Sequence, residues 1–472
     1  MSETLRQKSL QASADRLHKR VVESFEAGGR LAVIKAPPGS GKTYMLLRII
    51  GSMVEKGWLV AIATQTNTQA DDLVKQCVTH EVLHEFEVSR FGASGSVAPA
   101  EFPETANWIT GVGEIPSVPG LVIGTSAKWA TLKEAPAFDL FAVDEAWQMK
   151  WADMMRCSAV SDKYLLIGDP GQIPPVTSVD VSRWGTSQRP PHKAVPDVVL
   201  EKFSEAAEIG SLPSVRRLPH ASVAYVKPFY DFDFEAFAEK GDRAFEFKRS
   251  LRDSAIDAVP ENTNSNQGYC SGSSNYDEPV LKLVQKFATF EPILATIPTP
   301  EDGPPADTDL EIAIGVKRIV KGLLSLNASI SLKGDEKPVL IVDSDIGVTS
   351  SHRAMNGLLR KTLGQDFAGV RIDTPERWQG LEKPIMIAVH PLSGTQEPTD
   401  FDLGTGRLCV MASRHQIGLV IISRDHVVET LANTVTFATQ PPGQPDETGR
   451  GRKAHVDLME MLKENDRFTS LL

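Results

Sequence analysis

Cysteine is scarce in this chain of 472 residues, and its four copies lie far apart. Cys77, Cys157, Cys270 and Cys409 include no C-x-x-C pair. Paired cysteines at short spacing are the usual sign of a zinc site, and dense cysteines are typical of small disulfide-stapled proteins. The spacing argues against both, so we expect reduced thiols in a globular protein.

Long apolar runs are also missing. Segments such as Leu31 to Ile34 and Leu419 to Ile422 are far shorter than the roughly 20 residues that span a bilayer. No charged stretch followed by an apolar one opens the sequence, so no secretion signal is indicated. We expect a cytoplasmic protein that does not enter a membrane.

The chain has no excess of positive charge. It carries 61 acidic and 50 basic residues, which gives a formal net charge of −11. Nucleic-acid-binding proteins usually show a basic footprint, so this composition does not by itself indicate one. It does not exclude one either, because a groove that follows a single strand needs only local positive charge, hydroxyls, amides and stacking surfaces.

The most informative segment that is present reads APPGSGKT and runs from Ala36 to Thr43. A loop of this kind turns backbone N–H groups onto phosphates, its lysine reaches the β- and γ-phosphates, and its last hydroxyl holds Mg²⁺. Leu31 to Lys35 reads as a buried strand before the loop, and Tyr44 to Met53 has helical spacing after it. A glycine-rich turn without function would not explain this order. The predicted nucleotide-binding residues are Pro38, Gly39, Ser40, Gly41, Lys42, Thr43 and Tyr44.

Short apolar runs alternate with helical patterns from Leu31 to about Pro175, as in a parallel sheet covered by helices. The first candidate strands are Leu31 to Lys35, Leu59 to Ala63, Leu121 to Gly124, Leu140 to Val143 and Tyr164 to Ile167. A second set, without a phosphate loop, comprises Pro338 to Val342, Val370 to Ile372, Ile385 to Val389 and Leu419 to Ser423. We therefore predict an α/β fold with two cores.

The predicted domain organisation follows from these two sets. A helix occupies 1–30, the first core 31–212, a connecting segment with polar loops or a small insertion 213–310, the second core 311–435, and a flexible tail with a short terminal helix 436–472. Asn264 to Asn275 and Pro298 to Asp309 are rich in polar residues, Gly or Pro, and they read as surface loops.

Two carboxylates follow an apolar strand in the segment FAVDEAWQ, residues 141–148. In an α/β sheet this is the edge where ligands bind. Asp144 would hold Mg²⁺ through water, and Glu145 would orient and deprotonate the attacking water. The alternative is an exposed acidic turn. In the segment IGDPGQIPP, residues 167–175, Gln172 has the right group to touch the γ-phosphate or that water, although alone this would be only a turn.

The order of these segments resembles superfamily 1 helicases, specifically the 5′-to-3′ branch that contains the nonsense-mediated-decay RNA helicase. The Asp-Glu-Ala-x-Gln signature of that branch is matched at Asp144 to Gln148, and its Gly-Asp-Pro-x-Gln-hydrophobic-Pro-Pro signature at Gly168 to Pro175. The 3′-to-5′ branch differs at both positions. The resemblance implies two RecA-like P-loop NTPase domains with ATP in the cleft between them.

The resemblance also implies residues that grip a nucleic-acid strand. Thr66 and Asn67 lie in the first such motif, Thr125 in the second, and Thr374 would face the strand from the second core. Short polar side chains at strand ends suit contacts with the phosphate backbone, which carry no sequence information. Taken singly, each is more often a helix cap or a turn.

The second core would supply further nucleotide contacts. Ser214 to Pro219 resembles the motif that sends an arginine to the γ-phosphate, with Arg216 in register and Arg217 as the alternative. Gln379, Gly380 and Glu382 match the Gln-Gly-x-Glu motif that contacts the nucleotide. Arg414 would be the arginine finger, worth roughly 10³ to 10⁵ in rate in related nucleotidases, and the alternative is an ordinary surface ion pair. The implied catalytic set is Lys42, Asp144, Glu145, Gln172, Arg216 and Arg414, with Thr43 and Asp144 on the metal.

These features imply an ATP- and Mg²⁺-dependent helicase or translocase on single-stranded DNA or RNA, moving 5′ to 3′. We expect a monomer whose protein partners would dock on 231–309 or on the tail. The second hypothesis is an ATP-switched binding or remodelling subunit without processive unwinding. The acidic charge supports it, as does the short stretch between the first gripping motif and Leu121. A P-loop kinase or GTPase would leave the motifs from Arg216 to Arg414 without a role.

Overall fold

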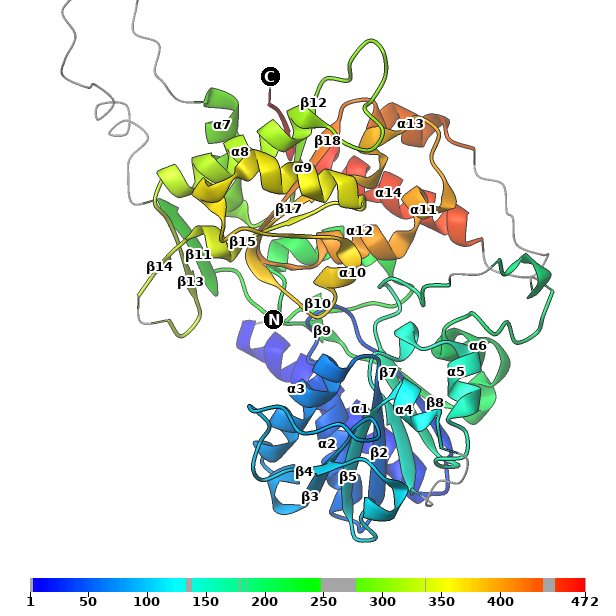
Figure 1. Ribbon diagram of the computed structural model, residues 1–472. Helices are drawn as coiled ribbons and strands as arrows, with labels where there is room; N and C mark the ends of the chain where they lie inside the picture. Colours follow the sequence, from blue (N-terminus) through cyan, green and yellow to red (C-terminus); the bar gives the residue numbers. More distant parts are fainter. Residues whose placement is uncertain are drawn as a thin grey trace, which may run out of the picture. The chain divides into compact units, whose positions relative to one another are not determined.

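The computed structural model describes residues 3–132, 138–177, 180–184, 186–247, 277–335, 337–435 and 446–471. The chain forms two compact units (Figure 1). The first comprises the residues up to Arg216 together with Phe232–Phe237, and the second comprises Arg217–Asp231 and the chain from Ala238 through Thr439 and from Pro445 onward. In the described parts of the chain, no helix is both long enough and apolar enough to cross a bilayer.

The first unit is built on an eight-stranded sheet in which every pairing is parallel. The strands lie in the order β4 (Asn107–Ile109), β3 (Glu87–Phe91), β5 (Gly120–Thr125), β2 (Leu59–Thr64), β6 (Leu140–Val143), β7 (Tyr164–Gly168), β1 (Leu31–Lys35) and β8 (Glu208–Ser211). All five strands predicted for this core are present. Central strands such as β2 are buried along their whole length, because parallel sheets are covered on both faces.

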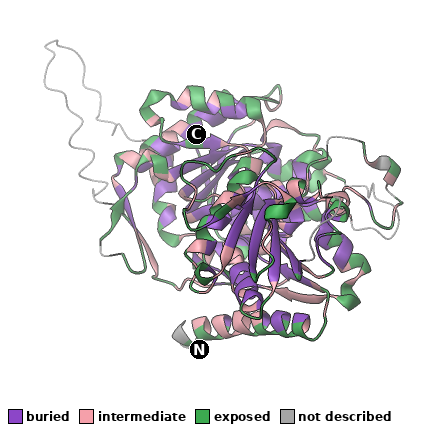
Figure 2. Cartoon of the chain, turned by 60° about the horizontal axis from the view of Figure 1, so that its bottom comes forward, coloured by how far each residue is buried: buried purple, intermediate pink, exposed green. Residues whose placement is uncertain are grey.

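Alternate residues of these strands enter two separate cores. Ala32 and Ile34 pack with apolar residues of α1 (Glu3–Glu26), α2 (Lys42–Val54) and α3 (Asn67–Val78). Val33 lies in the opposite cluster, with side chains of α4 (Ser126–Trp129), α5 (Trp151–Arg156) and α6 (Val195–Lys202). This sorting follows from the two-residue period of a strand. Figure 2 shows buried strands with exposure on the outer faces of the helices.

The second unit contains a six-stranded parallel sheet. Its order is β16 (Arg371–Asp373), β15 (Ile346–Thr349), β17 (Lys383–Val389), β18 (His415–Arg424), β12 (Ile293–Ile297) and β19 (Phe468–Ser470). The helices are α7 (Glu278–Gln285), α8 (Leu310–Ser325), α9 (Arg353–Leu363), α10 (Pro375–Trp378), α11 (Asp400–Leu403), α12 (Thr405–Ala412), α13 (Val427–Asn433) and α14 (Glu447–Glu464). Apolar side chains of α7, α8 and α9 share one core with the sheet. The predicted α/β fold with two RecA-like cores is confirmed.

The strands of the second core differ from the sequence prediction. The segment 338–342 was expected as a core strand, but β14 (Val339–Leu340) belongs to a small antiparallel sheet with β11 (Arg243–Phe247) and β13 (Ala328–Leu332). The core strand is β15 (Ile346–Thr349). It was not predicted from the sequence because it contains Gly347, and glycine is depleted in strands. A Cβ at Gly347 would lie 2.6 Å from the Trp378 ring, so the glycine makes room for that ring.

Two strands of the second sheet come from segments that were not predicted as core. The buried strand β12 lies within 213–310, which we had expected to be a connecting segment, and β19 lies in the expected tail. The tail also carries the 18-residue helix α14, which is longer than the short terminal helix expected there. The polar stretch Asn264 to Asn275 lies outside the described residues.

Candidate functional site

The phosphate loop joins β1 to α2 in the first unit. Gly39 and Gly41 have φ angles of 68° and 83°, in the left-handed region that glycine adopts without steric cost. Gly41 is the N-cap of α2 and offers no side chain, so the first amides of the helix are left for a ligand. The Ser40 hydroxyl is buried and has no hydrogen-bond partner among the described residues. These features fit a phosphate chain.

Lys42 is held by two carboxylates that follow β6. Its Nζ lies 3.0 Å from Asp144 Oδ1 and also forms an ion pair with Glu145. Burial acts to lower the pKa of Lys42, but the charges of Asp144 and Glu145 outweigh it and raise that pKa. Burial raises the pKa of Asp144, and Lys42 offsets only part of that rise. Two carboxylates around one ammonium group leave a net negative charge, which suits a site that also takes Mg²⁺ beside a triphosphate.

The backbone turns sharply where these carboxylates stand. Glu145 has a φ angle of 53°, which is uncommon for a residue with a side chain. The Glu145 amide donates to Asp144 Oδ1 at 2.9 Å, and this bond helps to hold the turn before the short 3₁₀ helix Ala146–Gln148. Strained backbone of this kind is concentrated at functional sites.

Gln172 lies in the turn after β7, and Asp169 determines how its amide is oriented. Gln172 Nε2 donates to Asp169 Oδ2 at 2.8 Å, and the Gly171 amide donates to Asp169 Oδ1 at 2.9 Å. The Gln172 carbonyl oxygen Oε1 is buried, and in the described part of the chain it has no hydrogen-bond partner. An acceptor in this position is what an attacking water would need in order to be oriented.

The other predicted nucleotide residues of the first unit lie along the start of α2. Thr43 follows Lys42 in the first turn and is partly buried, where its hydroxyl could join Asp144 on a metal ion. Tyr44 is exposed, and the guanidinium of Arg48 lies 5.5 Å from its ring centre. Pro38 is buried at the loop entry. The donor set of the first unit therefore fits ATP with Mg²⁺.

In the second unit, the Gln-Gly-x-Glu motif meets an arginine. Arg217 forms an ion pair with Glu382, and its Nη1 donates to the Ser413 carbonyl at 3.4 Å. Gln416 also donates to Glu382, at 2.7 Å. Burial acts to raise the pKa of Glu382, but the charges and hydrogen bonds of these partners, with a contribution from Arg414, lower it.

Other members of this motif lie close by in the sequence. Gln379 ends α10, and Gly380 has a φ angle of 79°, so the turn that leads to Glu382 requires glycine. Arg414 is 1% exposed, and its backbone carbonyl accepts from the Lys383 amide at 3.0 Å. A guanidinium this deeply buried is not an ordinary surface ion pair.

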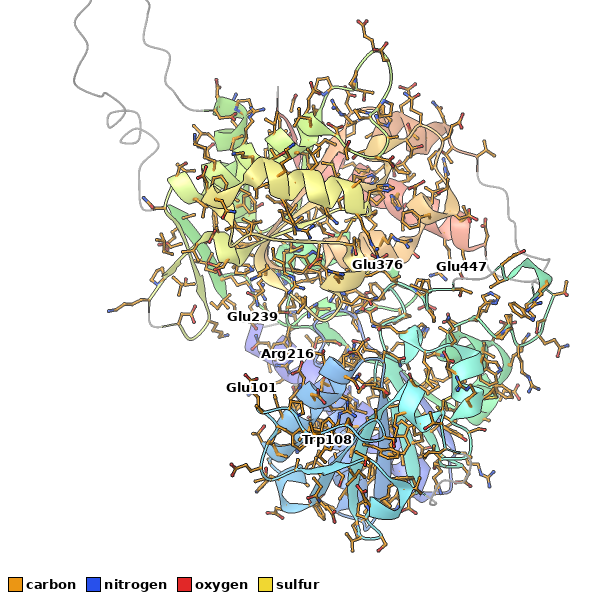
Figure 3. All side chains as sticks on the ribbon, in the orientation of Figure 1. Glu101, Trp108, Arg216, Glu239, Glu376 and Glu447 are labelled. Carbon is orange, nitrogen blue, oxygen red and sulfur yellow. The ribbon has the colours of Figure 1, made fainter. Side chains whose placement is uncertain are left out.

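Arg216 and Arg217 are placed very differently. The Arg216 side chain (Figure 3) donates to Gln11 of α1 at 3.0 Å and lies 3.9 Å from the centre of the Phe237 ring. The Arg216 amide donates to the Gly39 carbonyl at 2.8 Å, so its backbone supports the phosphate loop. Arg217 is grouped with Glu382 instead. Arg217, the alternative left open by the sequence, is therefore the arginine that pairs with the Gln-Gly-x-Glu motif.

The predicted strand-gripping residues lie at strand ends, and most of them cap helices. Thr66 caps α3 by accepting from the Gln69 amide at 3.2 Å, and Thr125 caps α4 by accepting from the Lys128 amide at 3.2 Å. Asn67 is exposed in the first turn of α3. Thr374 is at the N-cap position of α10, with no side-chain capping bond. The ordinary capping role is therefore present at Thr66 and Thr125.

Sequence reasoning missed one residue in this region. Arg90 of β3 is 1% exposed, and its guanidinium is bonded to Asn67 and Asp71. β3 itself had not been predicted, so no local pattern indicated this residue.

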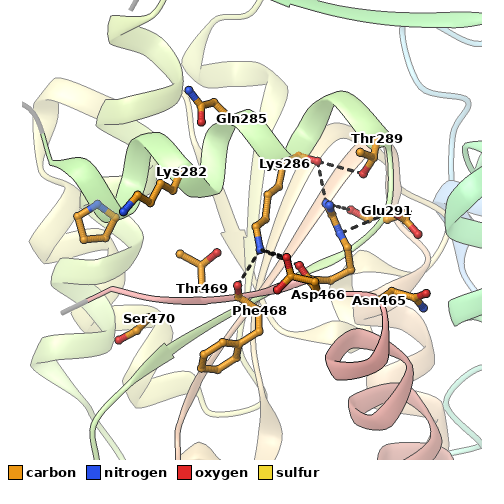
Figure 4. A pocket seen from close by; sticks show the side chains of 12 residues that line it. Lys282, Gln285, Lys286, Thr289, Glu291, Asn465, Asp466, Phe468, Thr469 and Ser470 are labelled. Carbon is orange, nitrogen blue, oxygen red and sulfur yellow. Dashed lines mark hydrogen bonds and ion pairs between the residues drawn. The ribbon is translucent and has the colours of Figure 1, made fainter.

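A separate hollow in the second unit lies between α7 and β19 (Figure 4). Lys286 reaches across it to the backbone carbonyls of Asp466 and Phe468, at 2.7 and 2.8 Å. None of the motif residues lines it. We therefore do not assign the nucleotide to this hollow.

Known proteins share similarity with this chain. Residues 16–209 match the family model described as "AAA domain", which covers the phosphate loop and both first-unit signatures. The chain is also 22% identical over 384 residues to the "DNA replication ATP-dependent helicase/nuclease DNA2" of Saccharomyces cerevisiae. These matches and the order of motifs support a superfamily 1 helicase. The alignment covers 78% of this chain but 23% of the yeast protein, so the chain spans about a quarter of that relative.

Solved helicase structures are also similar to this chain. The structure titled "The structure of PRRSV helicase" is 14% identical, covers 84% of this chain and 53% of that one, and has a TM-score of 0.40. An arterivirus nonstructural protein 10 helicase in complex with DNA is 14% identical, covers 83% and 61%, and has a TM-score of 0.39. The Hef helicase domain of Pyrococcus furiosus is 12% identical, covers 86% and 94%, and has a TM-score of 0.33.

The pairing of Arg217 with Glu382 predicts a pH-dependent stability. The folded pKa of Glu382 lies below its ordinary value of 4.5, so the pairing stabilises the protein fully above that pH and the stabilisation is lost as the pH falls through the folded pKa. We expect Arg217→Gln to lower the free energy of unfolding at neutral pH, and the difference from wild type to shrink in acid. Urea denaturation across this range measures it. Arg216→Gln is the matched control, and equal pH profiles for both variants would contradict the assignment.

Proposed function

We propose that this superfamily 1 helicase is an ATP-driven translocase that moves 5′ to 3′ along single-stranded DNA or RNA and unwinds the duplexes it meets. The observation that carries the proposal is the division of nucleotide chemistry between two parallel cores. The first has the loop lysine with Asp144 and Glu145, and the second has Arg217 with Glu382 but no phosphate loop. Each set is incomplete as an ATPase by itself.

In the proposed mechanism ATP binds to the first unit, and residues of the second unit take part in its hydrolysis. The phosphate loop and Lys42 would hold the triphosphate, Thr43 and Asp144 would hold Mg²⁺, and Gln172 would help Glu145 to orient the water. From the second unit, Arg217 and Arg414 would neutralise the charge that develops on the transferring phosphoryl group, and Gln379, Gly380 and Glu382 would contact the nucleotide. ATP binding would draw the units together and hydrolysis would release them, which moves a gripped strand in steps.

The second hypothesis remains an ATP-switched binding subunit without processive unwinding. One structural observation favours it: the chain between α3 and β5 contributes β3 and β4 to the first sheet rather than forming an inserted domain. The acidic net charge points the same way. We also propose the predicted domain division, with β12 and β19 added to the second core. The monomeric state, the cytoplasmic location and partner docking on 231–309 or the tail stay predictions.

The first test is nucleotide turnover with and without nucleic acid. We expect ATP hydrolysis to be strongly stimulated by single-stranded DNA, RNA or both, and to be abolished in Lys42→Ala. Glu145→Gln should still bind ATP but stall, because its amide cannot accept the proton of the water. Steady-state ATPase assays and nucleotide-binding titrations measure these effects. ATP turnover that neither DNA nor RNA stimulates would favour the second hypothesis, an ATP-switched binding subunit. Normal turnover in Glu145→Gln would refute the role of Glu145 as general base.

The direction of movement needs its own experiment. Duplexes with a single-stranded 5′ tail, a 3′ tail or two blunt ends should be unwound only when the 5′ tail is present. The blunt duplex is the control for loading, and Lys42→Ala controls for passive melting. Unwinding of the 3′-tailed substrate alone would overturn the proposed polarity.

The two neighbouring arginines can be separated by kinetics. Arg217→Ala should lower kcat by roughly 10³-fold or more while nucleotide binding to the first unit changes little, because a finger acts mainly in the transition state. Arg216→Ala should have a much smaller effect on kcat, since its contact with Gly39 is made by the backbone amide. If Arg216→Ala loses turnover and Arg217→Ala does not, Arg216 is the motif arginine, as the sequence register indicates.

A further inference from the structure

Arg90 is a buried cation beside the proposed strand-binding surface of the first unit. It lies in β3, next to β5, and its side chain reaches the start of α3. Only 1% of Arg90 is exposed. A buried arginine is expensive unless its charge and its N–H groups are all satisfied.

Each nitrogen of the Arg90 guanidinium has a partner. Nε donates to Asp71 Oδ1 at 2.7 Å, Nη1 donates to the Phe91 carbonyl at 2.7 Å, and Nη2 donates to Asn67 Oδ1 at 2.9 Å. The ring of Trp108 (Figure 3) has its centre 5.4 Å from the guanidinium carbon. A planar cation held in this way has one orientation, which a lysine could not reproduce with its single ammonium group.

The bond from Arg90 determines which end of the Asn67 amide is available. Because Oδ1 accepts from Arg90, the amide NH₂ is the end left for a ligand, and Asn67 is exposed. The hydroxyl groups of Thr66 and Thr125 are also left with a donor for a ligand. Each hydroxyl oxygen already accepts from a backbone amide of its own helix, so its proton is left to donate.

A phosphodiester offers only oxygens that accept hydrogen bonds. A surface whose exposed groups are hydrogen-bond donors therefore binds it in preference to ligand groups that are themselves donors. We propose that Arg90 is a positioning residue for nucleic-acid binding: it holds Asn67 so that the amide NH₂ donates to a backbone phosphate. This inference rests on the proposed function and adds to it.

The experiment measures the affinity of the full chain for a labelled single-stranded oligonucleotide, as DNA and as RNA, by fluorescence anisotropy. Arg90→Met and Asn67→Ala should each weaken binding roughly tenfold, the value of one hydrogen bond to a charged group. The double variant should be no weaker than the worse single variant, because both changes remove the same contact. If the loss of affinity in the double variant equals the sum of the two single losses, in free-energy terms, the proposal is overturned.

Two further variants keep the test decisive if Arg90→Met does not fold. Asn67→Asp retains an oxygen for Arg90 but places a second oxygen where the NH₂ stood, so it should fold and bind at least roughly tenfold more weakly. Asp71→Asn is the matched control. It removes the charge of the ion pair but keeps an acceptor for Nε, and it should bind within about twofold of wild type. Wild-type affinity in Asn67→Asp would refute the inference.

Salt dependence separates a positioning role from direct contact. If Arg90 acts through the neutral Asn67, the slope of log affinity against log salt should be the same in wild type and Arg90→Met. If Arg90 itself contacted a phosphate, the slope would fall by about 1. A wild-type chain that binds neither DNA nor RNA would refute the proposed function, whereas binding that is insensitive to Arg90 and Asn67 would refute only this inference.

Discussion

The ion cluster of Lys42 with Asp144 and Glu145 is the interaction on which the first unit depends. Two carboxylates side by side at the end of a buried strand would repel each other and lose their hydration. The ammonium group of Lys42, from the neighbouring helix, offsets this cost by forming an ion pair with each of them. The cluster exists only because β1 and β6 lie in one parallel sheet, separated by β7, so that both strands end at the same edge. The same edge carries Gln172, which follows β7.

Hydrogen bonds inside the first unit determine what its surface can bind. Asp169 takes the donor end of Gln172 and leaves a carbonyl oxygen, which suits a water molecule. Arg90 takes the acceptor end of Asn67 and leaves an NH₂ group, which suits a phosphate. Gln172 and Asn67 both end in a carboxamide, which can donate and accept hydrogen bonds equally well. The buried neighbour is an anion for Gln172 and a cation for Asn67, so a different end of each amide is left exposed to a ligand.

The second unit repeats the parallel architecture with different chemistry at its edge. Arg217 and Glu382 form an ion pair there, and Arg414 is buried close in sequence to the partners of that pair. An arginine that is already held by a carboxylate keeps one orientation, so little conformational freedom is lost when it meets a phosphate. Positive charge that is local and directed in this way does not require an overall basic chain.

The sequence alone indicated the class of protein that this chain resembles. The phosphate loop and the two signatures after β6 and β7 depend on local chemistry, namely glycine at positive φ and carboxylates or amides at strand ends, and such features can be recognised in a linear pattern. The five strands of the first core could be predicted for the same reason, since each is a short apolar run. Only the tertiary structure separated Arg216 from Arg217, because adjacent residues of one motif differ only in which partners fold against them. Likewise, β12, β15 and β19 became core strands only through their neighbours in the sheet, and the contacts of Arg90 with α3 are encoded by no local pattern.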